Sequence, residues 1–385
     1  MAQHMQDGWD RGRGSLAPLA VDDHVFPGMR PVVLKGDAAV CTIVVDAEED
    51  FDWLNPVFGT QHTTTNMHST RILQEIAGAY GLAPAYLLTY PILDAPEVVQ
   101  VLRRRVDRGE CELGVQLHPW VTPPFDNGSA SATSFAGNLA PELERRKLME
   151  LTRKFQECFG TAPRMYRAGR YGLGEHSADL LAELGFTIDT SLAPRTSFAF
   201  EGGPDYSSYG YRPFWFGGRA RLLEVPLCRE VVGWGGRWAP GILQALSAPL
   251  LDRLRASAIA TRVRCAERIT LSPEGNDLAA MVRLVRRLHA AGQRLFVLSF
   301  HSSSLAVGRN PYVQTKAQMH YFYDRLSGIL DFMASQLAMQ FTSLSRLPDL
   351  LAAPDPAPAS EARVASDMPA APHVPTAPGL PAGPD

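Results

Sequence analysis

Residues 112–120 read Glu-Leu-Gly-Val-Gln-Leu-His-Pro-Trp, an apolar run that ends at a histidine followed by a proline and an indole. The run predicts a buried β-strand that stops at His118. Because strand side chains alternate between two faces, Gln116 and His118 are expected to point to the same face. Two polar side chains on one face at a strand's end indicate a functional site. A core histidine bonded to the backbone is the alternative interpretation.

Similar apolar runs alternate with helix-like patterns along most of the chain. The strand-like segments are residues 40–45, 85–90, 111–118, 164–167, 186–189, 222–226, 268–272 and 294–301. The helix-like segments are residues 67–80, 96–108, 141–159, 177–184, 244–258, 277–291 and 318–336. This alternation predicts an α/β architecture with a mainly parallel sheet, for which a closed or nearly closed barrel is the favoured version.

The composition is that of an ordinary globular protein, with 45% hydrophobic and 20% charged residues and a formal net charge of −3. No basic block stands out, so nucleic acid is not an expected partner. The start of the chain is polar and unlike a signal peptide, and no run of about 20 apolar residues is present to form a transmembrane segment. The scattered cysteines are interpreted as reduced thiols, and these features together predict a cytoplasmic location.

The two ends of the chain lack the alternation seen in the middle. Residues 1–36 contain glycine, aspartate, arginine and proline without periodicity, and predict an N-terminal arm or a strap laid over the fold. Residues 351–385 are rich in proline and alanine, and they are predicted to be disordered because they can bury too little apolar area. Residues 37–350 are interpreted as one domain.

Four of the predicted strands end at residues suited to chemistry: Asp46, His118, Arg167 and His301. In parallel α/β folds ligands bind where the strands end, so these side chains are expected to gather at one site. His301 is followed by three serines, and an imidazole beside hydroxyl groups suits a general acid. Arg167 is able to pair with a carboxylate base and orient it, and a purely structural salt bridge is the alternative.

The first predicted strand leads into the acidic segment Asp46-Ala47-Glu48-Glu49-Asp50-Phe51-Asp52-Trp53. Its five carboxylates repel one another unless a cation or an arginine neutralises them. The segment therefore indicates a site for a hard cation that also supplies a general base, and an exposed acidic turn is the alternative. Glu48, Glu49 and Asp50 all remain candidates for the carboxylate that holds the ion.

Together, these motifs resemble the polysaccharide deacetylase (NodB-homology) superfamily, and most of all its WalW-like branch. The matching stretches run in order and cover residues 38–350: VVDAEEDFDW (44–53), ELGVQLHPWVTPPFD (112–126), NLAPELERRKL (138–148), YRAGRYGLG (166–174), EGGPDYS (201–207), LLEVPL (222–227) and LSFHSSSL (298–305). The resemblance implies a distorted (β/α) barrel with seven or eight mainly parallel strands in a single domain. It also implies a metal-dependent hydrolase that removes an acetyl group from an amino sugar of a bacterial glycan or glycan precursor, with Zn²⁺ as the first expectation for the metal.

The resemblance assigns a role to each residue of the predicted site. Asp46 is similar to the catalytic base of this superfamily, Arg167 to the arginine that orients the base, and His301 to the general acid. Glu48 and His118 are similar to its metal ligands. A carbohydrate is the implied substrate, and the residues expected to contact it are Trp120, Arg170 and Tyr171.

One position departs from the pattern of the superfamily. Relatives commonly read His-x-His-Pro-Trp where this chain has Gln116-Leu117-His118-Pro119-Trp120. A neutral amide oxygen holds a metal ion less tightly than an imidazole, so weak binding of the metal is expected. A catalytically weakened or inactive homologue that binds glycans or acts as a scaffold is therefore one alternative function. A C–N hydrolase that acts on a small cyclic amide is another.

Overall fold

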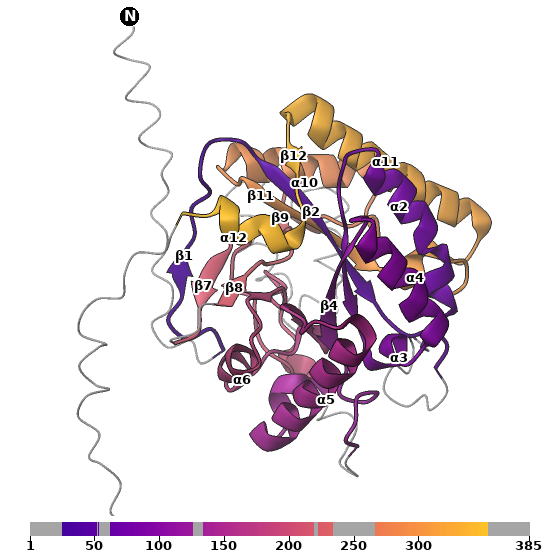
Figure 1. The fold of residues 1–385 in the computed structure, drawn as a ribbon. Coiled ribbons are helices and arrows are strands. Elements are labelled where there is room, and N and C mark those ends of the chain that lie inside the picture. The colour runs from indigo at the N-terminus through magenta and orange to yellow at the C-terminus, as the bar shows by residue number, and fades with distance from the viewer. Residues whose placement is uncertain are drawn as a thin grey trace, which may run out of the picture. The chain divides into compact units, whose positions relative to one another are not determined.

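The computed structural model describes residues 25–51, 53, 62–125, 134–218, 222–233 and 266–352. Residues 1–24 of the predicted arm, the predicted helix at 244–258 and the C-terminal segment 353–385 lie outside this described part. Within it, helices surround a curled sheet (Figure 1). Among the described helices, none combines the length and the apolar character needed to span a bilayer.

Within the described residues, the sheet is built around seven neighbouring parallel strands. In spatial order they are β8 (Leu222–Glu224), β6 (Ile188–Asp189), β5 (Met165–Ala168), β4 (Glu112–Leu117), β3 (Ala85–Leu88), β2 (Val40–Ala47) and β11 (Leu295–His301). A further short strand, β12 (Gln340–Phe341), also runs parallel to β2. At the far edge, β7 (Phe214–Phe216) pairs antiparallel with β8, and β1 (Arg30–Pro31) pairs antiparallel with β7. This curled sheet confirms the predicted distorted (β/α) barrel with seven or eight mainly parallel strands.

Most of the helices pack around the outside of the curled sheet (Figure 1). They are α2 (Arg71–Gly78), α3 (Tyr90–Leu93), α4 (Pro96–Asp107), α5 (Pro141–Phe159), α6 (Ser177–Glu183), α10 (Leu278–Ala290) and α11 (Lys316–Leu337), followed by the short α12 (Leu347–Leu350). A strand that is covered on one side by helices and faces the barrel interior on the other has no solvent-exposed face. All eight residues of β2 are accordingly buried, which explains why the strands appear in the sequence as continuous apolar runs.

The ends of α5 show how the local sequence sets the limits of a helix. Pro141 lies in the first turn, where its missing N–H breaks no helical hydrogen bond. Glu142 and Glu144 share that turn, and the exposed carboxylate of Glu142 interacts favourably with the helix dipole. Gly160 ends the helix in the left-handed conformation, with φ of 76°. In contrast, the helix predicted from residue 67 begins as a 3₁₀ helix, Thr65–Thr70, before α2.

One predicted barrel strand belongs to a different sheet. The segment predicted at residues 268–272 forms β10 (Glu267–Thr270), which pairs antiparallel with β9 (Arg229–Val232) in a separate two-stranded sheet. The amide of Ser299 in β11 donates to the carbonyl of Leu271, just after β10, at 3.2 Å. The small sheet therefore adjoins β11 and adds no parallel strand to the barrel. Sequence reasoning missed β9 because a four-residue segment that begins with Arg-Glu shows no strand pattern.

The described part of the N-terminal segment lies against the barrel. Phe26 is fully buried, and its ring meets Phe214 and Phe216 of β7 at centroid separations of 5.2 and 5.1 Å. Farther along, the amide of Ala352 donates to the carbonyl of Val33 at 2.8 Å. The segment therefore contacts β7 through Phe26 and β1, and the residues after α12 through Val33.

Candidate active site

The carboxyl ends of four parallel strands bring the predicted site residues together. Asp46 and His301 are register partners on β2 and β11. Gln116 and Arg167 are register partners on β4 and β5, and His118 directly follows β4. Because all these strands run in the same direction, their ends form one edge of the barrel.

Asp46 and Arg167 form a buried ion pair across the barrel. The Nη1 atom of Arg167 donates a short hydrogen bond to Asp46 Oδ1 and a second one, of 3.1 Å, to Ser299 Oγ. The Nε atom of the same guanidinium donates to both the carbonyl and the hydroxyl of Thr190 at 3.0 Å. Burial raises the pKa of Asp46, and the Arg167 charge offsets part of that effect. The arginine is thus held in one orientation against this carboxylate.

Glu48, Gln116 and His118 form a second group, which we name the Glu48–Gln116–His118 triangle. Gln116 Nε2 donates to Glu48 Oε1 at 2.7 Å and lies 3.0 Å from His118 Nε2, while His118 Nε2 is 3.3 Å from Glu48 Oε1. On the other side of the imidazole, His118 Nδ1 lies 3.1 Å from Glu49 Oε1. When the Nδ1 proton is donated to Glu49, Nε2 presents its lone pair to the triangle, which is the tautomer that binds metals.

The three candidate carboxylates of the acidic segment have different surroundings. Glu48 Oε1 faces the imidazoles of both His118 and His301, whereas Glu49 contacts the far side of His118. Asp50 accepts hydrogen bonds from residues 63–66, which lead into the 3₁₀ helix Thr65–Thr70. Of the three, Glu48 is therefore best positioned to bind the same metal ion as the histidines.

His301 is fixed by a carboxylate that the sequence did not single out. The two carboxylate oxygens of Glu274, Oε2 and Oε1, lie 3.0 and 3.2 Å from His301 Nδ1. Glu274 Oε1 also accepts a hydrogen bond from the backbone amide of His301 at 2.9 Å. The free Nε2 atom of His301 is 3.8 Å from Asp46 Oδ2 and 4.0 Å from Glu48 Oε1. Burial by itself would lower the pKa of His301, but Glu274 and Glu48 outweigh it and raise that pKa to about 10. An acid just after the strand predicted at 268–272 was the available signal for Glu274.

The acids of this site attract positive charge. Burial alone would raise the pKa of Glu48, but the facing His301 and His118 hold it below its usual value. Burial would lower the pKa of His118, but Glu49 and Glu48 outweigh it and raise that pKa to about 10. In addition to the triangle, Asp46, Glu48 and His301 offer ligand atoms that all lie within 4.8 Å of one another. Two overlapping donor sets, which share Glu48, are thus available to a cation.

The residues predicted to contact substrate surround these groups. Trp120 stacks on His118, with ring centroids 4.2 Å apart, and Tyr171 lies under the Arg167 guanidinium at 5.6 Å. Trp53, from the acidic segment, meets His301 edge-on at 5.0 Å. Arg170 precedes Tyr171 in the chain, but its guanidinium is engaged by Ser134 and Glu201 and covers the ring of Phe135 at 4.2 Å.

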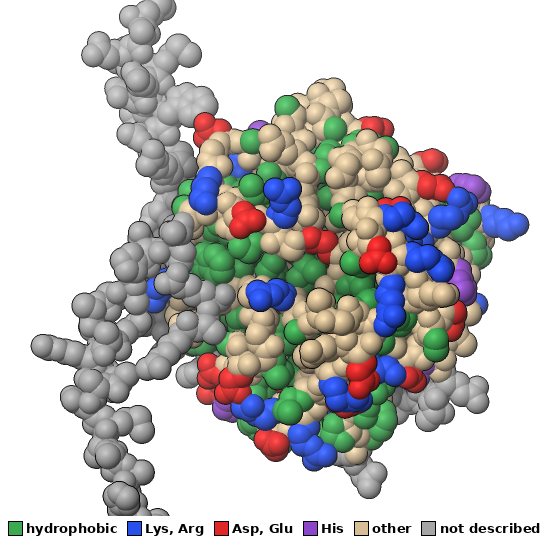
Figure 2. Space-filling view, viewed as in Figure 1, with side chains coloured by type: hydrophobic (Ala, Val, Ile, Leu, Met, Phe, Trp, Pro, Cys, Tyr) green, Lys and Arg blue, Asp and Glu red, His purple; other side chains and the backbone are tan. Residues whose placement is uncertain are grey.

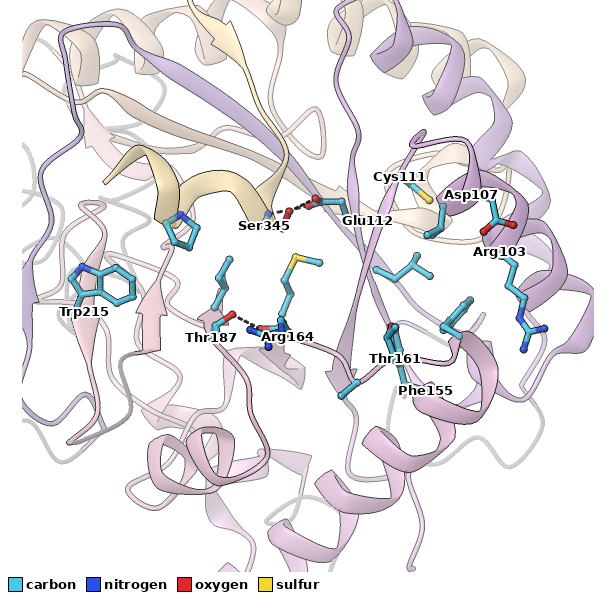
Figure 3. Close-up of a pocket in the computed structure, with 17 residues that line it drawn as sticks. Arg103, Asp107, Cys111, Glu112, Phe155, Thr161, Arg164, Thr187, Trp215 and Ser345 are labelled. Carbon is cyan, nitrogen blue, oxygen red and sulfur yellow. Dashed lines mark hydrogen bonds between the residues drawn. The ribbon is translucent and has the colours of Figure 1, made fainter. Parts of the chain in front are cut away.

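A separate cavity of about 720 Å³ lies at the opposite end of the strands. Its walls include Glu112, Met165 and Ile188, at the amino ends of β4, β5 and β6, and Trp215 of β7 (Figure 3). None of the candidate catalytic residues lines it, so it is distinct from the site described above. On the molecular face shown in Figure 2, acidic and basic side chains are interspersed among polar and apolar ones.

No protein-family model matches the sequence, and no curated protein matches it. Solved structures similar to this one include several described as polysaccharide deacetylases or CE4 proteins, the superfamily whose motifs the sequence resembles. One, assigned as a polysaccharide deacetylase from Mycobacterium smegmatis, has a TM-score of 0.49 and 16% identity over 92% of this chain and 99% of that chain. The Puue allantoinase has a TM-score of 0.46 and 12% identity over 88% and 96% of the two chains. A CE4 family pseudoenzyme from Bacillus anthracis has a TM-score of 0.36 and 8% identity over 81% and 66%.

Proposed function

We propose that this protein is a metal-dependent hydrolase that removes an acetyl group from an amino sugar of a bacterial glycan or glycan precursor. The observation that supports this function best is the convergence of three groups at one edge of the barrel, the buried Asp46 and Glu48 and the partly exposed His301. Asp46 is held by Arg167, and His301 faces both Asp46 and Glu48 through one ring nitrogen. A base, an acid and a carboxylate able to hold a cation are the groups that metal-assisted amide hydrolysis requires.

The buried donors fit a divalent ion. Glu48 Oε1 and His118 Nε2 are 3.3 Å apart. Neighbouring ligands that bind one ion at 2.0–2.2 Å are separated by about 3 Å, so the two atoms are suitably spaced. Glu49 would hold the imidazole in its metal-binding tautomer. When bound, Zn²⁺ or another divalent ion would polarise the acyl carbonyl and a water molecule.

Asp46 is placed to accept a proton from the attacking water. Its Oδ1 atom is occupied by Arg167, whereas Oδ2 faces the centre of the site, 3.8 Å from His301 Nε2. Because burial raises the pKa of Asp46, the carboxylate is a stronger base than an exposed aspartate. We assign Asp46 as the general base and Arg167 as the residue that orients it.

His301 is placed to protonate the leaving amine. Glu274 binds its Nδ1 atom, so the Nε2 proton is directed toward Asp46 and Glu48. With a pKa raised to about 10, the imidazole carries its proton at neutral pH and can act as the general acid.

The aromatic side chains suit a sugar substrate. Trp120 and Trp53 are half-buried beside the two imidazoles, and their flat faces offer apolar surface to a pyranose ring. Tyr171 lies on the Arg167 side of the same site. We propose Trp120, Tyr171 and its neighbour in the chain, Arg170, as sugar contacts.

Acetate release from N-acetylglucosamine oligosaccharides tests this function. Asp46→Asn and His301→Ala should each lower the rate by about 10²-fold or more, because each removes one proton transfer. The matched controls are Asp324→Asn and His320→Ala, two exposed positions on α11 that should keep the wild-type rate. Wild-type acetate release by both site variants would exclude this mechanism.

One observation favours a second candidate function, a glycan-binding scaffold without hydrolytic activity. The amide nitrogen of Gln116 donates to Glu48 and lies 3.0 Å from His118, so a neutral side chain stands where the superfamily pattern has a histidine. Metal analysis of the purified protein together with the acetate assay separates the two candidates. A protein that binds oligosaccharide but neither holds a divalent ion nor releases acetate would be the scaffold.

A further inference from the structure

We infer that Gln116 is a third protein ligand of the divalent ion, through its amide oxygen, and that it shifts the preference of the site from Zn²⁺ toward a harder cation such as Mn²⁺. This inference rests on the proposed function and names the residue of this chain that selects the ion. It concerns the position at which the sequence departs from the superfamily pattern.

The position of the Gln116 amide is that of a ligand. The side chain is buried, and its terminal nitrogen completes a triangle with edges of 2.7, 3.0 and 3.3 Å. Neighbouring ligands at 2.0–2.2 Å from one ion are separated by about 3 Å, so the three edges fit a common ion. A histidine is therefore not required at residue 116 for a third donor to reach this point.

The orientation of the amide depends on what lies between Glu48 and His118. In the structure the NH₂ end faces them: Nε2 donates to Glu48 Oε1 and lies 3.0 Å from His118 Nε2. The carbonyl end, Oε1, is buried and has no hydrogen-bond partner among the described residues. A cation in the triangle would repel the NH₂ end and attract Oε1. Rotation of the terminal amide by a half turn exchanges the two atoms without any movement of the backbone.

The overlapping set Asp46, Glu48 and His301 is a poorer ligand set. Asp46 Oδ1 is engaged by Arg167, and His301 Nε2 is 3.8 and 4.0 Å from the nearest oxygens of Asp46 and Glu48. These separations exceed every edge of the Glu48–Gln116–His118 triangle. An ion in the triangle also leaves Asp46 and His301 available for proton transfer.

The chemistry of the donors sets the preference among ions. Imidazole suits Zn²⁺, whereas carboxylate and carbonyl oxygens suit Mg²⁺, Ca²⁺ and Mn²⁺. With Gln116 the triangle has two oxygens and one nitrogen, whereas a histidine at this position would give one oxygen and two nitrogens. The ratio of Zn²⁺ to Mn²⁺ affinity should therefore be lower in this protein than in a variant that has the second histidine.

The test is direct measurement of ion affinity on the full chain after treatment with a chelator. Dissociation constants for Mn²⁺ and for Zn²⁺ are measured at one pH by competition with a chromophoric chelator, for the wild type, Gln116→His and Gln116→Leu. Gln116→Leu should weaken Mn²⁺ binding by about 10–100-fold, as expected when a group that supports a metal site is lost. Gln116→His should raise the preference for Zn²⁺ over Mn²⁺ at least tenfold. The control is Gln293→Leu, a buried glutamine that donates to backbone carbonyls outside the site and should leave both constants unchanged.

Acetate release by the wild type, measured in parallel, separates the role of Gln116 from the proposed hydrolase function. Equal Mn²⁺ affinity in the wild type and Gln116→Leu, or an unchanged ion preference in Gln116→His, would overturn the role of Gln116. If the wild type still released acetate only with a bound ion, the proposed function would stand. A wild type that binds neither ion would overturn the inference together with the metal dependence.

Discussion

The ion pair of Asp46 and Arg167 should contribute strongly to stability as well as to chemistry. Only 2% and 1% of the two side chains are exposed. Removal of one partner from a buried pair costs about 3–5 kcal/mol, because the remaining charge has neither water nor a counter-ion. We therefore expect Arg167→Met to lower the free energy of unfolding by about 3–5 kcal/mol.

A double-mutant cycle isolates the pair from the other contacts of the arginine. Arg167 also donates to Thr190 and Ser299, and those hydrogen bonds are lost equally in Arg167→Met and in the double variant with Asp46→Asn. Their contribution cancels in the cycle. The coupling energy between Asp46 and Arg167 should be about 2–3 kcal/mol, near the upper end of the range for residues in contact.

The assay is urea unfolding at one pH, with a chelator present so that ion binding does not contribute. The matched control is Arg153→Met, which breaks a surface pair with Glu150 in which 53% and 25% of the side chains are exposed. That change should cost less than about 1 kcal/mol. A coupling energy below about 0.5 kcal/mol between Asp46 and Arg167 would refute the reasoning, and the assignment of Arg167 as the orienting residue would fall with it.

Two further predictions concern pH and the position of His118. Burial raises the pKa of Glu144 from 4.5 to about 7, so its stabilising contribution is complete below pH 4.5 and is lost as the pH rises through 7. The loss amounts to about 3 kcal/mol, and Glu144→Gln should reduce the fall in unfolding free energy between about pH 4 and 8 by that amount; a pH dependence equal to that of the wild type would contradict the assignment. Gly169→Ala would place a methyl group 2.5 Å from the carbonyl oxygen of Leu117 and 2.6 Å from His118 Cδ2, so His118 must move. Ion binding and acetate release should fall about tenfold or more, whereas Gly78→Ala, with open space around the added carbon, should change neither. Normal ion binding by Gly169→Ala would show that the position of His118 tolerates this shift.

The barrel and four residues at its edge are predictable from the sequence. A parallel strand covered on both sides is a continuous apolar run, so β2, β4 and β11 are recognisable without knowledge of their neighbours. The residues at the ends of such strands must lie at one edge of the sheet. The four predicted residues are found there. Asp46 pairs with Arg167 and lies near His301, and His118 lies near Glu48.

Partners contributed by distant or irregular segments are not predictable in this way. Glu274 follows a strand of the small sheet, and only tertiary packing places its carboxylate against His301. The directions in which the acidic side chains after β2 point could not be predicted either, because the alternation of side chains in a strand does not apply beyond the end of the strand. Asp50, for example, turns toward residues 63–66 through hydrogen bonds that the sequence does not reveal.

The parallel pairing of β2 with β11 has a consequence for the order in which the protein forms during synthesis. The amide of Glu48 donates to Ser302 Oγ, a contact between residues 254 positions apart in the sequence. At a translation rate of about 5–20 residues per second, the ribosome needs roughly 13–50 seconds to make the intervening chain. During that interval the strand that ends in the acidic segment lacks its neighbour on one side, and long-range pairing of this kind is slow to form. The nascent chain therefore exposes an apolar strand edge before it acquires His301, the proposed general acid, and chaperone binding to that edge is the expected safeguard.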